Sequence, residues 1–264
     1  MQYNVLHSDI WSIVASFLKP REIKILGQSS RFIYKNCRNF MTYSYNQHGT
    51  DESYYKIHTA KWIVDGCDNT ILDDCVYKNM VLVEILFGRY FNESINVIPN
   101  PTHLRHITFN DLFNQSIDIL ATCRQLESIM FGFYFNKSID CISNCRQLKC
   151  ITFGSDFNQS IKALSNCTEL EYLTFGACFN KSINALSSCV KLKRITFGVY
   201  FNKSIQSLSN CINIEYIYFD HYFNQPLIAL SNCTQLKYVR FGAMFNQSIA
   251  ILNIMNISYV CRKN

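Results

Sequence analysis

Apolar residues recur along most of this chain with a period of 22 residues. The repeating unit reads FNxSIxxLSNCxxLxxITFGxx, with Phe at position 1 and Gly at position 20. Eight copies run in phase, and their first residues are Phe91, Phe113, Phe135, Phe157, Phe179, Phe201, Phe223 and Phe245. A fixed period of this length is typical of solenoids, in which similar units stack along one axis.

Within one unit, the pattern predicts a short β-strand followed by a turn. Positions 14, 17 and 19 are almost always Leu, Ile and Phe, and the fourth copy has Leu170, Leu173 and Phe175 there. The alternation at positions 17 and 19 favours a strand over about positions 16 to 19. Glycine at position 20 is expected to end the strand with a turn. Positions 1 to 8 are too short for a regular helix and two turns, so they predict an irregular or briefly helical return arm.

No single unit can bury its own Phe, Ile and Leu side chains, so the units must stack with parallel strands around one continuous core. Position 15 gives an independent indication of the register, because its charge alternates in sign: Arg105, Glu127, Lys149, Glu171, Lys193, Glu215 and Lys237. Equivalent residues of neighbouring coils would then attract one another. The sequence therefore predicts a leucine-rich-type parallel β-solenoid over residues 81–264.

Asparagine at position 2 and cysteine at position 11 also recur in phase, and we expect both to be structural. Each coil corner leaves backbone groups without a strand partner, and an asparagine amide can both donate to and accept from the next coil. Free cysteine behaves as a small apolar side chain. The rival interpretation of the N-x-S/T sites as glycosylation sites is weaker, because a secretory signal is missing and the cysteines look free. The predicted structural ladder consists of Asn114, Asn136, Asn158, Asn180, Asn202, Cys145, Cys167, Cys189 and Cys211.

The two ends of the array depart from the repeat, as the caps of a solenoid must. Residues 81–88 are in phase with the strand and its Gly, so they predict a degenerate first coil. Residues 46–80 are expected to form a linker and N-terminal cap, with a helix over 54–64 docked on that coil. The last copy lacks the cysteine and drifts off the pattern after residue 252.

The repeats resemble the FNIP repeat, a leucine-rich variant named for its Phe-Asn-Ile-Pro signature. The matching copies read FNQSI at Phe113, Phe157 and Phe245, and FNQPL at Phe223. The resemblance covers residues 91 to about 252, although Ser mostly stands where the family has Pro. The LSNCTxL segments at Leu164 and Leu230 are also similar to BspA-type leucine-rich repeats. FNIP repeats are typical of slime moulds and of large DNA viruses of amoebae, which suggests such a source.

Residues 1–45 predict a small three-helix region. Apolar residues at 10, 13, 14, 17 and 18 have helical spacing, with Ser8 as the N-cap, and Pro20 and Ser29 or Ser30 suit the starts of two further helices. This order resembles the F-box, although His7 replaces the usual Pro and Asp9 the usual Glu. A three-helix cap of the solenoid is the alternative interpretation. The F-box resemblance implies that the helices bind a Skp-type adaptor through Leu6, Ile10, Ile13, Phe17, Leu18 and Leu26.

Strand positions 16 and 18 should point away from the core, onto the concave side. Toward the C-terminal half they carry Tyr172, Arg194, Tyr216, Tyr218, Tyr238 and Arg240. Tyrosine and arginine are enriched at binding hot spots, so we expect a partner to bind there. The competing explanation is that exposed strand positions favour tyrosine through β-propensity alone.

Composition narrows the function classes. The net charge of +6 is spread without a basic run, which argues against nucleic acid as a partner. No apolar run is long enough to span a membrane, and the start of the chain has no secretory pattern, so a reducing compartment, the cytoplasm of a cell or of a viral host, is expected. The histidines do not recur with Ser, Cys or Asp at motif spacing, so neither an enzyme nor a cofactor or metal site is expected.

The resulting hypothesis is a protein-interaction module, namely the substrate receptor of a Skp–cullin–F-box-type ubiquitin ligase, in which the repeats hold the target protein. The alternative is a repeat scaffold or host-interaction protein with no ubiquitin role. Either way, we expect a monomer outside its complex.

Overall fold

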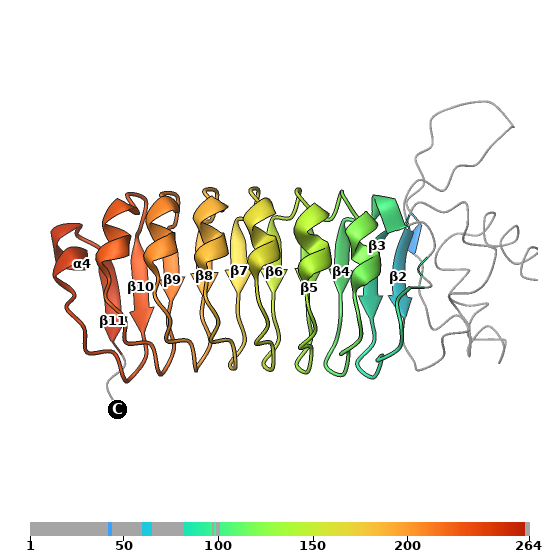
Figure 1. Ribbon diagram of the computed structural model, residues 1–264, viewed down its shortest axis with the longest axis horizontal. Coiled ribbons are helices and arrows are strands. Elements are labelled where there is room, and N and C mark those ends of the chain that lie inside the picture. Colours follow the sequence, from blue (N-terminus) through green and yellow to red (C-terminus); the bar gives the residue numbers. More distant parts are fainter. Residues whose placement is uncertain (1–41, 44–59, 65–81, 97, 99–100, 262–264) are drawn as a thin grey trace, which may run out of the picture.

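The computed structural model describes residues 42–43, 60–64, 82–96, 98 and 101–261. Over these residues the chain is a solenoid in which each coil from β4 to β11 contributes one strand to a long sheet and one short helix to the opposite side (Figure 1). The predicted three-helix region at 1–45 lies outside the described residues except for 42–43, and so does most of the predicted linker at 46–80.

The described strands form one eleven-stranded sheet whose spatial order follows the sequence. Strand β1 is antiparallel to β2, and every later pair is parallel. Residues 22 apart are direct neighbours from β3 to β10, as in Ile151, Leu173 and Ile195, which confirms the predicted stacking. The strands are β1 (Thr42–Tyr43), β2 (Ala60–Val64), β3 (Leu82–Phe87), β4 (His106–Thr108), β5 (Ser128–Met130), β6 (Cys150–Thr152), β7 (Tyr172–Thr174), β8 (Arg194–Thr196), β9 (Tyr216–Tyr218), β10 (Tyr238–Phe241) and β11 (Ser258–Cys261).

The return arm of each regular coil contains a 3-10 helix, which confirms the expectation of a briefly helical segment. Five residues close too few i→i−4 bonds for an α-helix, and the tighter i→i−3 pattern suits such short segments. In the coil of β7, the N–H groups of Leu164 and Cys167 donate to carbonyls three residues earlier, each at 3.0 Å. The 3-10 helices are η3 (Pro101–His103), η4 (Asp118–Thr122), η5 (Asp140–Asn144), η6 (Lys162–Asn166), η7 (Asn184–Ser188), η8 (Gln206–Asn210) and η9 (Ile228–Asn232).

Serine at position 4 forms a local turn at the start of the return arm. Ser138 Oγ accepts a hydrogen bond from the N–H of Asp140 at 3.1 Å, and Ser182 does the same for Asn184 at 3.3 Å. A serine hydroxyl that accepts from the N–H two residues later forms a local turn. This turn leads the chain into the 3-10 helix.

Phenylalanines at positions 1 and 19 form two continuous stacks through the interior. Phe153 lies 4.0 Å from Phe157 between ring centroids, and Phe157 lies 6.1 Å from Phe179 of the next coil. The Ile, Leu and Cys side chains of the repeat fill the remaining space, and no polar or charged residue is buried among the described ones. Every coil therefore depends on both neighbours to complete its core.

Glycine is required at position 20 for a reason other than the turn that we expected there. A Cβ atom on Gly154 would lie 1.7 Å from the carbonyl oxygen of Gly132, and one on Gly176 would lie 2.0 Å from that of Gly154. Neither glycine has the left-handed φ angle that would require the residue. Glycine is therefore needed because backbones of successive coils approach closely at the end of the strand.

Both ends of the array differ from the regular coils. Strand β3 forms the first coil, as expected, but residues 60–64 form β2, which pairs in parallel with β3, so the predicted helix over 54–64 is wrong for that part. Short apolar runs do not distinguish helix from strand, and Trp, Ile and Val favour the latter here. In the last coil, α4 (Ala250–Ile254) replaces the 3-10 helix, and Asn256, with φ of 55°, leads into β11.

Candidate partner-binding face

The outward side of the sheet, which we call the strand face, is formed by positions 16 and 18 of β3 to β10. Alternation along each strand buries position 17 and leaves its two neighbours facing outward. In β7, Leu173 is buried, Thr174 is half-buried and Tyr172 is exposed. The strand face is thus the part of the sheet that a partner can reach.

The six residues predicted for partner binding lie together on the C-terminal half of this face. Tyr172, Arg194, Tyr216 and Tyr238 are consecutive neighbours in position 16, and Tyr218 and Arg240 are neighbours in position 18. We call these six residues the tyrosine–arginine cluster: Tyr172, Arg194, Tyr216, Tyr218, Tyr238 and Arg240.

Cation–π and aromatic contacts join the two rows of the cluster. The Cζ atom of Arg194 lies 4.9 Å from the ring centroid of Tyr216, and that of Arg240 lies 5.3 Å from Tyr218. The rings of Tyr218 and Tyr238 are 5.8 Å apart at an angle of 50°. Stacking of a guanidinium on an aromatic ring restricts the motion of both side chains. The cluster therefore presents a preordered surface of rings and guanidinium groups.

The N-terminal half of the strand face carries smaller or less distinctive side chains. Position 16 has His106, Ser128 and Cys150, and His106 Nδ1 lies 2.9 Å from the Ser128 hydroxyl. In position 18, Met130 is the exposed large side chain between two threonines. The same scaffold thus supports two unlike surfaces.

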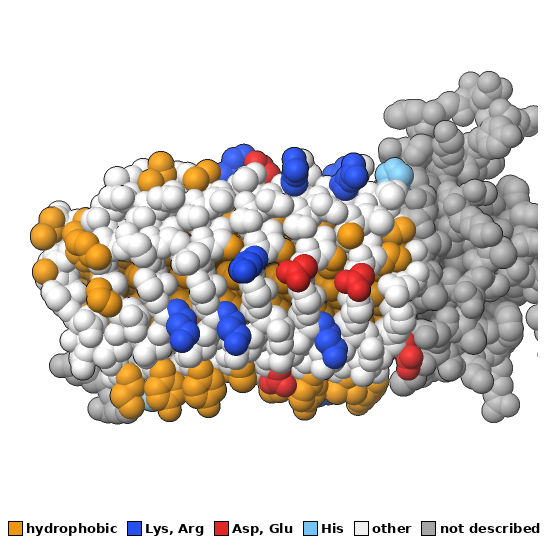
Figure 2. All heavy atoms as spheres, in the orientation of Figure 1, with side chains coloured by type: hydrophobic (Ala, Val, Ile, Leu, Met, Phe, Trp, Pro, Cys, Tyr) orange, Lys and Arg blue, Asp and Glu red, His pale blue; other side chains and the backbone are white. Residues whose placement is uncertain are grey.

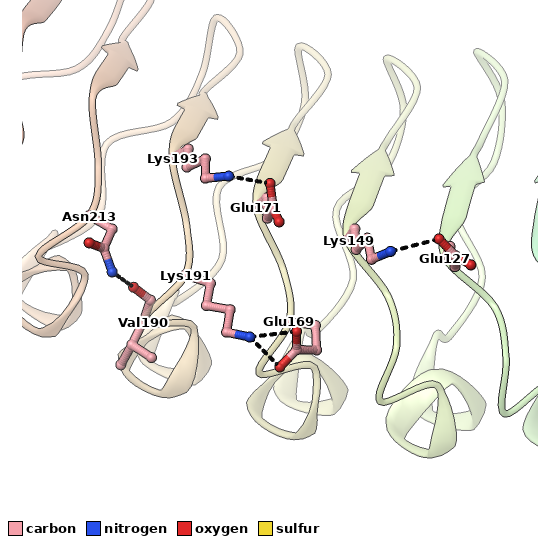
Figure 3. A network of polar contacts seen from close by, with 8 residues as sticks. All are labelled: Glu127, Lys149, Glu169, Glu171, Val190, Lys191, Lys193 and Asn213. Carbon is pink, nitrogen blue, oxygen red and sulfur yellow. Dashed lines mark hydrogen bonds and ion pairs between the residues drawn. The ribbon is translucent and has the colours of Figure 1, made fainter.

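Position 15, which we call the charged row, forms ion pairs between neighbouring coils. Glu127 pairs with both neighbours: its Oε1 lies 3.1 Å from Arg105 Nη1, and its Oε2 lies 2.8 Å from Lys149 Nζ. In the next coils, Glu171 Oε2 lies 2.7 Å from Lys193 Nζ (Figure 3). A further pair joins Glu215 to Lys237 at 2.6 Å. The side-by-side placement inferred from the alternating signs is confirmed, although the row breaks into separate groups and is not one continuous chain of bonds.

These contacts shift the pKa values of the paired side chains so that both partners stay charged. The hydrogen bond from Lys149 holds the pKa of the Glu127 carboxyl below its ordinary value. The same bond raises the pKa of the Lys149 ammonium. The pairs are largely exposed to solvent, so they fix the register more than they stabilise the fold.

Two further inter-coil pairs escaped the sequence analysis, because each occurs only once. Lys191 Nζ lies 2.7 Å from Glu169 Oε2, two positions before the charged row (Figure 3). Arg89 Nε lies 3.1 Å from Asp111 Oδ2 in the turns that follow the strands. Both pairs join residues 22 apart, so a comparison of neighbouring copies for opposite charges at every position would have revealed them.

The asparagines of position 2 form a continuous row of hydrogen bonds. Asn136 Oδ1 accepts from the backbone N–H of Asn158 at 3.0 Å, and Asn158 Oδ1 accepts from that of Asn180 at 3.0 Å. The same bond recurs from Asn92 to Asn246. Glutamine at position 3 adds a second donor in some coils, as Gln159 does to Asn136 at 3.0 Å. The side-chain amides thus supply the partners that the corner backbone lacks.

The cysteines of position 11 are buried, and their thiols lie close to carbonyls of the preceding coil. Cys211 Sγ lies 3.2 Å from the carbonyl oxygen of Leu186, and Cys189 Sγ lies 3.5 Å from that of Leu164. Burial raises the pKa of both thiols to about 12. A thiol that stays protonated is neither a nucleophile nor a metal ligand at neutral pH. In the described part of the chain, no group of three or more His, Cys, Asp or Glu side chains is placed to hold a metal ion.

One exposed surface was missed altogether. Apolar side chains at position 22 protrude from the turns after the strands and form a row along the lower edge of the molecule (Figure 2). Tyr200 and Tyr222 stack there at 5.4 Å, while Asp156 and Cys178 interrupt the row. We assigned no role to position 22 from the sequence, although its apolar residues recur. The members of this turn ridge are Tyr90, Leu112, Tyr134, Tyr200, Tyr222 and Met244.

The adaptor-binding residues implied by the F-box resemblance lie outside the described residues, so the structure neither groups nor separates them. None of the helices that the structure describes has the length and apolar character needed to cross a membrane.

No protein-family model matches the sequence, and no curated protein does either. Solved structures do match. CroV588, a circular leucine-rich-repeat protein from a giant virus, is 33% identical over 66% of this chain, with a TM-score of 0.52, and this chain spans 26% of the length of CroV588. An internalin of Listeria monocytogenes is 16% identical, with a TM-score of 0.61 and coverage of 78% of this chain and 68% of the internalin.

The Toll–Spätzle complex of Drosophila gives a third match, with 11% identity, a TM-score of 0.54 and coverage of 70% of this chain and 30% of the matched chain. The structural neighbours are thus leucine-rich-repeat proteins, and the fold is a solenoid of that type.

Proposed function

We propose that this chain is a protein-interaction module that binds its partner through the tyrosine–arginine cluster. The observation that carries the proposal is the grouping of four tyrosines and two arginines on the exposed face of consecutive strands. These residue types dominate binding hot spots because they combine large area with hydrogen-bonding groups. The Toll–Spätzle complex, in which a structurally similar repeat protein is bound to another protein, supports the same class of function.

The test is a quantitative affinity purification with the full chain and a matched pair of variants. Tyr216→Ala with Tyr218→Ala removes two rings from the cluster, and Met130→Ala removes an exposed side chain from the other half of the strand face. We expect a partner retained by the wild type and by Met130→Ala to be lost from the double variant by about tenfold or more. Equal retention by all three proteins, with unchanged circular dichroism, would place the binding site elsewhere.

A finer proposal is that the module is the substrate receptor of a Skp–cullin–F-box-type ubiquitin ligase that acts in the cytoplasm. Its support is the resemblance of residues 1–45 to the F-box and their position ahead of a repeat array. In this arrangement the helices hold a Skp-type adaptor and the strand face holds the target protein.

The adaptor part has its own test. Purified Skp-type adaptor is mixed with the full chain and with Ile10→Asp and Ile13→Asp variants, and binding is measured by interferometry. We expect binding by the wild type and its loss in both variants. If the wild type also fails to bind, the scaffold or host-interaction alternative without a ubiquitin role replaces this proposal, and the tyrosine–arginine cluster remains the proposed binding site.

A further inference from the structure

Among the residues that the structure describes, the two arginines of the cluster differ from the bases of the charged row in having no acidic partner. Every base of the charged row lies within 3.1 Å of a glutamate oxygen on a neighbouring coil: Arg105, Lys149, Lys193 and Lys237. Within the described residues, Arg194 and Arg240 make no ion pair, and each guanidinium lies over a tyrosine ring. Their charge is thus held in place and left unneutralised.

The balance of charge over the strand face and the charged row shows the same asymmetry. On these two surfaces, residues 83–152 contribute two bases, Arg105 and Lys149, and two acids, Glu84 and Glu127. Residues 171–240 contribute four bases but only two acids, Glu171 and Glu215. The surplus of two positive charges is located in the cluster.

The positions of the two guanidinium groups suggest the shape of the ligand. Arg194 is in position 16 of β8, and Arg240 is in position 18 of β10, two strands away. Strand spacing and rise place these positions about 12 Å apart. An extended peptide rises about 3.3 Å per residue, so side chains at i and i+4 lie on one face about 13 Å apart. Two carboxylates with that spacing match the two arginines.

We infer that the partner presents an extended acidic segment whose carboxylates pair with Arg194 and Arg240 while its backbone and apolar side chains contact the tyrosines. This inference rests on the proposed function and adds the chemistry of the partner. Guanidinium and carboxylate form charge-assisted hydrogen bonds, which are stronger than neutral ones. Stacking on Tyr216 and Tyr218 leaves the N–H edges of the guanidinium groups available for such bonds.

Tyrosine and arginine on a sheet also suit single-stranded nucleic acid, whose bases stack on aromatic rings. The surrounding charges favour a polypeptide. Glu171 and Glu215 are paired with Lys193 and Lys237 in the charged row beside the cluster, so only Arg194 and Arg240 offer unneutralised positive charge on this half of the described sheet. Two guanidinium groups suffice for two discrete carboxylates, whereas a nucleic acid presents a phosphate at every nucleotide and needs a continuous basic track.

The experiment uses the full chain and a fluorescein-labelled 12-residue peptide, mostly Gly and Ser, with Glu at positions i and i+4 and Leu between them. Binding is measured by anisotropy, and the arginine Nε–Hε signals are followed by NMR. A peptide with Gln in place of both Glu residues is the ligand control. Arg146→Gln is the protein control, because Arg146 is exposed and makes no ion pair among the described residues.

We expect the Glu peptide to shift the signals of Arg194 and Arg240, and Arg194→Gln with Arg240→Gln to weaken its binding by about tenfold or more. The Gln peptide should give only the baseline anisotropy of an unbound peptide. The Arg146→Gln variant should bind the Glu peptide with the affinity of the wild type. Equal binding of both peptides, an equal loss in Arg146→Gln, or tighter binding of an oligothymidine of similar length would each overturn the inference. If the partner capture still depends on Tyr216 and Tyr218 while the arginine variants are unaffected, only the acidic chemistry fails and the binding site stands.

Discussion

The N-terminal and C-terminal halves of the strand face stand on the same interior but present different surfaces. In the coils of β5 and β6 and in those of β7 to β10, the same phenylalanine stacks, asparagine row and cysteine row repeat coil after coil. On the outward side, the N-terminal half carries smaller or less distinctive side chains with balanced charges, whereas the C-terminal half carries the tyrosine–arginine cluster. The difference lies at outward strand positions, where neighbouring coils touch but do not require the same residue in every copy.

This contrast separates what builds the array from what it recognises. A buried residue must fit the equivalent residue above and below, so its identity is set by the stack. An exposed strand residue meets solvent, so a change there costs little stability. Substitutions inside the array should thus affect both halves alike, and only substitutions on the strand face should distinguish them.

The largest effect is expected from the phenylalanine stack. Phe135 and Phe201 are fully buried, and the ring centroid of each lies 4.0 Å from that of the position-19 phenylalanine four residues earlier and about 6 Å from those of the position-1 phenylalanines in the coils before and after. Replacing either by Ala should lower the free energy of unfolding by about 3–5 kcal/mol. Denaturant melts should give similar losses for both, and the exposed Phe133→Ala serves as the control. A loss confined to one half would contradict a shared interior.

The buried thiols should make the array sensitive to alkali, equally in both halves. Burial raises the pKa of Cys123 and of Cys233 from 9.0 to about 11. Because the folded-state pKa is the higher one, the stabilising contribution is complete below pH 9 and is lost as the pH rises toward 11.

Unfolding free energies from pH 8 to 10.5, measured under reducing conditions, test this point. Between these pH values, one thiol lowers the stability by up to about 1.4 kcal/mol per pH unit. Cys123→Ala and Cys233→Ala should each flatten the alkaline slope relative to the wild type by a similar amount. Slopes identical to that of the wild type would mean that these thiols ionise in the folded protein.

Substitutions in the asparagine row should lower the free energy of unfolding by a smaller amount, and only where another repeat coil follows. Asn136 Oδ1 and Asn202 Oδ1 each accept two hydrogen bonds from the next coil. Alanine at either position leaves a backbone N–H without its partner and should lower the stability by about 1 kcal/mol. Asn246, whose Oδ1 receives only the side chain of Gln247, is the matched control. Thermal melts in which Asn246→Ala costs as much as the other two would rule out this inter-coil role.

Much of this fold could be predicted because the same pattern of apolar and polar residues occurs in eight copies. The strand at positions 16 to 18, the parallel register and the first coil before Phe91 all follow from side chains that must match their neighbours. The reason for the glycines could not be predicted from one coil. Gly154 and Gly176 are required by the backbone of the preceding coil, which only the assembled array brings near.

The candidate site was less predictable than the scaffold. The six cluster residues were visible as outward strand positions, but their stacking depends on side-chain directions, which the sequence does not fix. Strand β2 was mistaken for a helix because five residues carry too little periodicity. The turn ridge was overlooked because exposed aromatic residues at turns have no local structural cause to signal them.

The charged row should give the smallest effect at neutral pH, and a reversal of charge shows what it does. Glu127→Gln and Glu215→Gln remove exposed pairs and should move the Tm by no more than about 2 °C. Glu127→Lys instead places three bases side by side, because Glu127 lies between Arg105 and Lys149. Its Tm should fall below that of Glu127→Gln in low salt and recover in 1 M salt, where repulsion is screened. A Tm of Glu127→Lys that is independent of salt would mean that the alternating signs do not act on the register, whereas a salt-dependent loss would show that they disfavour misaligned coils.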